Sequence, residues 1–376
     1  MSTSESAVDG RLPDDPMTPA VETSDEAGSS TTCLTAQTYG GQAVIEGVMM
    51  LGRTSWAIAV RRPSGGIARA VYPLEKLGSR HPWMKLPVIR GVIGMYESFA
   101  IGIKALGISA NVGLEDPDAP DAGQDTVITD IPAAASEAAA GPDSGASSEP
   151  AGAKKAADEP AFGWKELTLT VSIAVVFAVG LFVVLPLFFV KYFEETFSNP
   201  FVFNLVEGII RIAIFLIYIV VISLLPDLRR VFMYHGAEHK IIHSYEACGR
   251  PDTDRARAYP TMHPRCGTGF LLLVMVLAVF LFAIVGKPSL PWLVLSRLIG
   301  IPLIIGIGYE IGIKWLGRRA NKLYARILLW PGIQLQRLTT REPTPDQLEV
   351  AAVALAEVLR VDAAEAVPAK ELTAQA

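Results

Sequence analysis

The chain has 376 residues, 51% of them hydrophobic, and a formal net charge of −5. Its mean hydropathy of +0.35 is high for a soluble protein, so the composition favours membrane-spanning segments. No nucleic-acid-binding motif and no basic stripe with interleaved aromatic residues is present, so we expect no nucleic-acid partner.

Two segments are acidic and poor in large apolar residues. Residues 1–36 are rich in Ser, Thr, Asp, Glu and Pro, and residues 115–161 are rich in Ala, Gly, Pro, Asp and Ser. Neither segment can bury enough apolar surface to offset its chain entropy. We predict a disordered acidic tail and a disordered acidic linker.

Residues 37–114, between these segments, predict a small β-rich domain. Its β-rich runs are Ala43–Met49, Ser55–Arg61 and Gly66–Tyr72. The intervening RPSGG sequence has the Pro and Gly residues that a hairpin turn requires. We expect a small cytoplasmic sheet packed at the membrane surface.

The end of this domain, residues 87–110, is apolar but carries Arg90, Glu97 and Lys104. It is too charged for a clear span, so we predict an amphipathic helix in the interface or a re-entrant helix. A fifth span is the alternative, but it would move the sheet to the other side of the membrane.

Four later stretches approach the roughly 20 apolar residues that a transmembrane helix needs. They are Leu167–Val190, Phe201–Leu225, Phe270–Val285 and Leu290–Tyr309. The first two lie in residues 162–226 and the last two in residues 270–315. The second span carries Glu207 and Arg211 at i, i+4 spacing, which favours an ion pair. We therefore predict an α-helical integral membrane protein with about four transmembrane helices.

Basic residues predict the orientation of these spans. The segment between the second and third spans holds seven of them: Arg229, Arg230, Lys240, Arg250, Arg255, Arg257 and Arg265. The loops on the other side carry little positive charge. By the positive-inside rule we expect a multi-pass protein of the inner (plasma) membrane with both termini cytoplasmic.

Residues 227–269 carry most of the candidate site. The sequence DLRRVFMYHGAEHKIIHSYEAC predicts a helix that ends near Gly249. His235, His239 and His243 fall on one face of this helix, together with Glu246. Two histidines one turn apart can bind one metal ion, but the rise of about 12 Å from His235 to His243 prevents one ion from taking all three. The ligand pair is either His235–His239 or His239–His243, or two ions lie side by side.

Further ligands are expected from TMHPRCGTGF, which carries His263 and Cys266. Cys266 precedes the third span, with Thr268 as the expected helix cap, and a helix N-terminus favours the thiolate. The sequence thus predicts a divalent metal site, with zinc expected. The alternative is a polar interfacial helix whose histidines only form hydrogen bonds.

The sequence HGAEH also matches the H-x-x-E-H pattern of inverted zinc peptidases, in which the glutamate is the general base. Glu238 is therefore the candidate catalytic residue, with Glu246 as the alternative. The more distant acidic ligand of those peptidases is not evident in this chain.

Residues 316–362 predict a cytoplasmic amphipathic region, followed by a tail over residues 363–376. Within it, TPDQLEVAAVALAEVL opens with a capping pattern: Thr344 at the cap, then Pro345, then Gln347. We interpret this helix as a packing element.

Five motifs occur in an order that resembles the YqhQ-like family of uncharacterised bacterial membrane proteins, described as predicted metal-dependent enzymes. They are GGQAVIEGVMM at 40–50, AVRRPSGGI at 59–67, YHGAEHK at 234–240, HPRCGTGF at 263–270 and QRLTTREP at 336–343. The resemblance implies metal positions at His235, Glu238, His239, His263 and Cys266. It also points to Gly41, Gln42, Glu46 and Gly47, with Glu46 as a hypothetical distant acidic ligand.

Two functional hypotheses follow. The first is a metal-dependent hydrolase at the membrane surface, which acts on a lipid-linked or membrane-protein substrate. Its expected partners include the membrane lipids. The second is a non-enzymatic scaffold or assembly factor with a structural metal. A transporter is a third alternative, and a homo-oligomer is compatible with all three.

Overall fold

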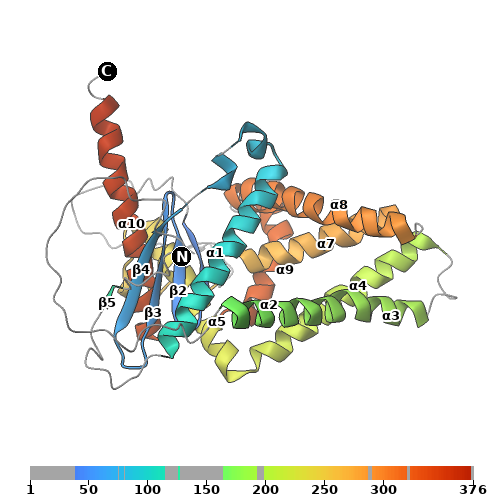
Figure 1. Cartoon of the computed structure of the whole chain (residues 1–376), viewed down its shortest axis with the longest axis horizontal. Helices are drawn as coiled ribbons and strands as arrows, with labels where there is room; N and C mark the ends of the chain where they lie inside the picture. The colour runs from blue at the N-terminus through green and yellow to red at the C-terminus, as the bar shows by residue number, and fades with distance from the viewer. Residues whose placement is uncertain are drawn as a thin grey trace, which may run out of the picture.

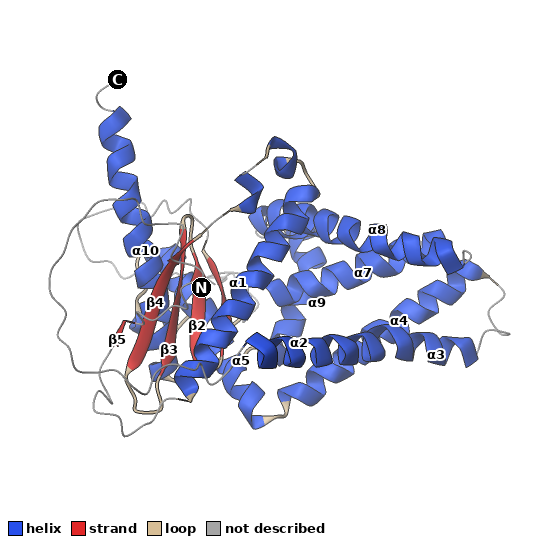
Figure 2. Ribbon diagram, viewed as in Figure 1, coloured by secondary structure: helices blue, strands red, loops and turns tan. Residues whose placement is uncertain are grey.

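The computed structural model describes residues 39–74, 76–79, 81–114, 126–127, 164–192, 199–286, 290–319 and 322–373. The acidic tail predicted over residues 1–36, and nearly all of the linker predicted over residues 115–161, lie outside the described residues. The described chain forms a small sheet flanked by helices, beside a group of long apolar helices (Figures 1 and 2).

The sheet has the strand order β1-β2-β3-β4-β5. Its strands are β1 (Gly40–Val44), β2 (Gly47–Leu51), β3 (Ser55–Arg61), β4 (Ile67–Pro73) and β5 (Thr126–Val127). The first four are antiparallel, and β5 is parallel to β4. The hairpin predicted at RPSGG joins β3 to β4, with Gly65 at a φ of 100°.

The β-rich run predicted over Ala43–Met49 is not one continuous strand. A two-residue turn at Ile45 and Glu46 divides this stretch into β1 and β2, with Val44 paired to Gly47. Such a turn requires a positive φ, and Glu46 adopts 52°. The sequence gives no Asn-Gly or Asp-Gly signal there, because a glutamate occupies the position that usually takes a small residue.

Each face of the sheet is covered by helices. On one face, Met49 and Ile58 pack with Ala105 and Val112 of α1 (Ile89–Gly113). On the opposite face, side chains of β2 and β3 pack against α5 (Pro226–Cys248) and α10 (Pro345–Thr373). The period-two alternation of the strands therefore gives the sheet two buried faces.

Helix α10 begins with the predicted cap. The backbone N–H of Thr344 donates to Gln347 Oε1 at 2.9 Å. Further along, Asp362 accepts hydrogen bonds from the Tyr39 hydroxyl at 3.0 Å and from the Thr54 hydroxyl at 2.9 Å. These contacts tie the far end of the chain to the first strands, so α10 is a packing element of the sheet.

The long apolar helices are α4 (Pro200–Ser223), α7 (Gly267–Val285) and α8 (Leu290–Gly308), which continues as the π-helical η5 (Tyr309–Leu316). A further helical run comprises α2 (Trp164–Val179), η4 (Gly180–Val184) and α3 (Leu185–Tyr192). Short elements are η1 (Leu77–Ser79), η2 (Pro82–Lys85), α6 (Thr253–Ala256) and η6 (Gly317–Arg319). Helix α9 (Leu323–Thr339) crosses α7 closely, because Gly269 meets Gly332 there.

Four helices among the described residues are long and apolar enough to cross a membrane: Ile89–Gly113, Pro200–Ser223, Gly267–Val285 and Leu295–Leu316. Three correspond to predicted spans. The first predicted span, Leu167–Val190, contains a shorter apolar helix, Thr168–Val184. Helix α1, predicted to lie in the interface, meets the length and composition of a span.

Helix α1 joins the sheet to the long helices. Its second half packs on the sheet, and Gly91 in its first turn lies against Gly306 and Tyr309. Next to Gly91, the Arg90 guanidinium forms a two-pronged ion pair with Glu310, at 2.6 and 2.5 Å. This pair fixes the start of α1 on η5.

The ion pair predicted within the second span is present. Arg211 pairs with Glu207, whose exposed fraction is 2%, and Arg211 Nε also donates to the carbonyl oxygen of Phe182 at 2.9 Å. The pair satisfies two buried charges inside an apolar helix and links α4 to η4.

Candidate metal centre

Helix α5 presents the histidines as the sequence predicts. Pro226 opens the helix, and Gly249 ends it in the left-handed conformation with a φ of 72°. The face that carries the histidines packs against the loop around Thr261–Cys266 and the end of α9. Two separate groups of side chains result, and the rise of the helix places His243 apart from His235 and His239.

The first group consists of His235, His239 and Cys266, whose candidate ligand atoms lie within 4.8 Å of one another. His235 Nε2 lies 3.3 Å from Cys266 Sγ. The centroids of the two imidazole rings are 4.5 Å apart. Three candidate ligands, of two residue types common in zinc sites, therefore lie close together.

The hydrogen bonds of the two rings fix their orientation. His235 Nδ1 lies 2.8 Å from the carbonyl oxygen of Thr339, and His239 Nδ1 lies 2.5 Å from that of Thr261. Because a carbonyl oxygen only accepts, each Nδ1 carries a proton, and Nε2 is the ring nitrogen left to face a ligand. Metal-bound histidines are commonly oriented in this way by a backbone carbonyl.

Cys266 is itself the N-terminal cap of α7, whereas the sequence predicted Thr268. The backbone N–H of Thr268 donates to Cys266 Sγ at 3.4 Å, and the Thr268 hydroxyl lies 3.1 Å from the same sulfur. Burial of the thiol raises its pKa, but His235 and His239 outweigh burial and hold the pKa of Cys266 well below 9.0. Burial conversely lowers the pKa of His235, but the Cys266 thiolate raises it to about 9.

The second group consists of His243, Glu246 and His263. Its polar atoms are largely engaged: Glu246 pairs with Arg265, and His243 Nε2 lies 3.0 Å from the carbonyl oxygen of Met262. His263 Nδ1 accepts from the backbone N–H of Arg265 at 3.3 Å, so its Nε2 carries the proton and faces Glu246 Oε2 at 3.7 Å.

Burial holds the pKa values of His243 and His263 at about 3, with further lowering by a neighbouring histidine in each case. Both rings are therefore neutral at physiological pH. The second group is a hydrogen-bonded cluster around an ion pair, and it offers fewer free lone pairs to a metal than the first group.

Glu238 lies beside the first group without belonging to it. Its side chain is buried, and burial raises its pKa, whereas His239 and His235 act in the opposite direction. The backbone N–H of Gly41 in β1 donates to its carboxylate. A Cβ at Gly41 would lie 3.2 Å from Glu238 Cγ and 2.4 Å from the Met49 carbonyl oxygen, so glycine permits this close approach.

Glu46, hypothesised as a distant acidic ligand, belongs to neither group. It pairs with Arg230 and accepts from the Tyr234 hydroxyl at 3.3 Å. Gln42 points to α1, where its amide donates to the carbonyl oxygen of Ser98. From the motif at 40–50, the structure brings only Gly41 to Glu238.

Sequence reasoning missed several supporting groups. The carbonyl oxygens of Thr261 and Thr339 have no side-chain signal, because any residue supplies a carbonyl. Gln336 holds the loop through both amide atoms, which bond to the backbone N–H and carbonyl of His263 at 2.7 and 2.9 Å. Gln336 is the first residue of the motif QRLTTREP. The motif therefore pointed to this residue, but the sequence did not show that Gln336 holds the backbone of His263.

Comparison with known proteins agrees with the resemblance of the motifs. A family model described as "Protein of unknown function (DUF1385)" matches residues 86–361. The chain belongs to this family. It is also 29% identical over 331 residues to the "Uncharacterized protein YqhQ" of Bacillus subtilis (strain 168), covering 86% of this chain and 93% of that protein. No solved structure matches the chain.

Proposed function

We propose that this DUF1385 family member is a membrane protein that holds a divalent metal, expected to be zinc, through His235, His239 and Cys266. The observation that carries the proposal is the pair of imidazoles whose Nδ1 atoms are tied to carbonyl oxygens, with both Nε2 atoms left for a ligand beside the cysteine sulfur. Catalytic zinc sites typically use three protein ligands, and histidine and cysteine are both among the residue types that supply them.

We further propose that the metal serves a hydrolase that acts at the membrane surface. A bound zinc ion would supply Lewis-acid chemistry. Glu238 is the residue proposed to hold or transfer a proton, because burial raises its pKa toward the range of a general acid or base. The Gly41 N–H orients its carboxylate, and the carbonyl oxygens of Thr339 and Thr261 hold the two imidazoles in place.

The apolar helices support a place in the inner membrane. We propose that α4, α7 and α8 cross it together with the helical run α2–α3, with both termini in the cytoplasm. In this orientation the His-bearing loop lies just beyond the ends of α4 and α7. A lipid-linked or membrane-protein substrate suits that position, and a homo-oligomer is compatible with it.

A specific observation also favours the second function, a scaffold with a structural metal. A metal held by the first group would connect α5 to the N-terminus of α7, and the hydrogen bond from His235 Nδ1 to Thr339 links the same site to the end of α9. His239 has an exposed fraction of 2%, which resembles a closed structural site.

The first test measures bound metal by mass spectrometry in protein purified in mild detergent. Wild type is expected to hold roughly one ion per chain. His239→Ala is expected to lose it, whereas the matched variant His243→Ala, one helical turn away, retains it because His243 belongs to the second group. Equal metal content in all three proteins would contradict the assignment.

The second test separates the enzyme from the scaffold with Glu238→Gln, which keeps the shape of the side chain but removes its titratable proton. The enzyme hypothesis predicts normal metal content and loss of hydrolysis of ester, phosphodiester or peptide probes in mixed micelles. A variant of undiminished activity excludes the proposed role of Glu238. The scaffold hypothesis is supported if a chelator that removes the metal unfolds the protein while Glu238→Gln has no effect on function.

A further inference from the structure

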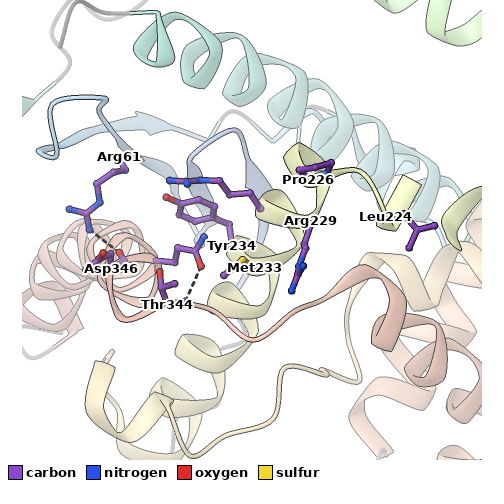
Figure 3. A pocket seen from close by; sticks show the side chains of 10 residues that line it. Arg61, Leu224, Pro226, Arg229, Met233, Tyr234, Thr344 and Asp346 are labelled. Atoms are coloured by element: carbon purple, nitrogen blue, oxygen red, sulfur yellow. Dashed lines mark hydrogen bonds between the residues drawn. The ribbon is translucent and has the colours of Figure 1, made fainter. Parts of the chain in front are cut away.

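A pocket of about 410 Å³ lies between α5, the end of α4, β3 and the start of α10. Figure 3 shows Arg229 and Leu224 at one side of it, Arg61 and Asp346 at the other, and Tyr234 between them. Its volume falls in the range of about 300–1,000 Å³ that is typical of ligand sites. None of its lining residues belongs to either histidine group.

Three arginines line this pocket, and two of them already have carboxylate partners. Arg61 pairs with Glu349 at 2.7 Å and donates to the backbone oxygen of Asp346. Arg230 pairs with Glu46. The Arg229 guanidinium has no ion-pair or hydrogen-bond partner within the part of the chain that the structure describes.

The polar groups around the arginines suit an anion with several oxygens. Thr344 and Gln347 line the pocket at the N-terminus of α10, where the helix dipole favours negative charge. Asp346 is the one acidic residue that lines it, and its carboxylate opposes an anion. A phosphate group bound near Arg229 would supply the partner that this guanidinium lacks.

The other rim of the pocket is apolar and leads onto α4. Leu224 and Leu225 follow the last turn of this helix, with exposed fractions of 74% and 50%. On the same helix Ile217 and Val221 are exposed at 63% and 55%. A basic pocket at the end of an apolar helix with an exposed side is the arrangement that suits a phospholipid, with its headgroup at the arginines and its acyl chains along the helix.

We propose that this pocket binds the phosphate-bearing headgroup of an anionic phospholipid, with Arg229 as the principal contact. The proposal rests on α4 crossing the membrane, as the proposed function also assumes, but it does not depend on the metal.

The experiment titrates the purified protein in mild detergent with short-chain phosphatidylglycerol, short-chain phosphatidylcholine or inorganic phosphate, and follows the unfolding temperature. A ligand that binds only the folded state raises this temperature with concentration, which gives an apparent Kd. Arg229→Gln removes the principal contact. Arg250→Gln, at an exposed arginine two residues beyond the other end of α5, is the control for lost charge. Asp346→Asn removes the opposing carboxylate.

Phosphatidylglycerol is expected to stabilise wild type more than phosphatidylcholine or phosphate does. Arg229→Gln should weaken its apparent Kd about fivefold, the effect of one basic contact near an anionic surface. Arg250→Gln should leave it unchanged, and Asp346→Asn should tighten it, a gain that misfolding cannot produce.

Three results would overturn the proposal. They are unchanged affinity in Arg229→Gln, an equal loss in Arg250→Gln, and inorganic phosphate binding as tightly as the lipid, which would indicate a free anion. Metal content measured in the same samples separates this proposal from the metal site, because Arg229→Gln should retain the metal whatever its lipid affinity.

Discussion

At the scale of residues, the two histidine groups differ in their third residue and in the hydrogen bonds of their imidazoles. His235 and His239 each direct Nδ1 to a carbonyl oxygen, whereas His263 accepts an N–H at Nδ1. The first group therefore directs Nε2 of both rings away from the backbone carbonyls and beside a thiolate, and the second surrounds the pair formed by Glu246 and Arg265. Histidines on α5 and in the loop that faces it therefore acquire different chemistry from the backbone groups around them.

The thiolate of Cys266 leads to a prediction for the metal-free protein. The pKa of Cys266 should lie well below 9.0 and should rise in His235→Gln, because burial continues to raise it while the lowering effect of His235 is lost. The measurement is the pH dependence of the thiolate absorbance in a Cys33→Ser, Cys248→Ser background. Equal midpoints with and without His235 would contradict the predicted ion pair.

The same pair affects stability through His235. Its pKa of about 9 in the folded protein exceeds the ordinary value of 6.5. Its contribution to the free energy of unfolding is therefore complete below about pH 6.5 and is lost as the pH rises through 9. In His235→Gln this loss of stability at high pH should be absent.

At the scale of elements, the site depends on the close approach of β1 to α5. Gly41 allows the strand backbone to reach Glu238, and a Cβ at that position would meet the Met49 carbonyl oxygen at 2.4 Å. The adjacent Gly40 has nothing within 4 Å of its own added Cβ. Two neighbouring glycines in one strand therefore have different structural requirements.

Gly41→Ala should lower the free energy of unfolding by about 1–3 kcal/mol, because the strand must shift to accommodate a methyl group. Gly40→Ala is the matched control and should have little effect. Chemical denaturation in detergent compares the two variants, and an equal loss in both would contradict the close approach.

At the scale of the whole molecule, α1 determines how the sheet would lie relative to the membrane that α4, α7 and α8 are proposed to cross. Its second half buries Ala105 and Val112 against the sheet, with exposed fractions of 0% and 4%. Open sheet edges are not tolerated in the hydrocarbon region of a bilayer. Although α1 has the length and composition of a span, this packing favours a place at the membrane surface, anchored to η5 by Arg90 and Glu310.

This placement predicts the result of a topology experiment. A reporter that is active only outside the cytoplasm should be inactive when inserted within residues 128–160, because α1 then leaves both of its ends in the cytoplasm. Inserted within residues 193–198, between α3 and α4, it should be active and serves as the positive control. The reverse pattern would show that α1 crosses the membrane.

The sequence by itself determined the elements whose signals are local. Apolar length predicted α4, α7 and α8, helical spacing placed the histidines on one face of α5, and the capping pattern at Thr344 placed the start of α10. Such signals are readable because hydrophobic length, helical periodicity and caps depend on residues a few positions apart.

Only the tertiary structure decided which histidines act together. It paired His235 and His239 with Cys266, assigned His263 to the ion pair of Glu246, and directed Glu46 to Arg230. It also revealed the turn at Ile45 and Glu46. There the Glu46 carbonyl oxygen accepts a hydrogen bond from the backbone N–H of Arg61 in β3, and the glutamate adopts a positive φ that this residue type seldom adopts. These outcomes depend on backbone carbonyls and neighbours distant in sequence, and residue identity alone does not encode which of them will meet.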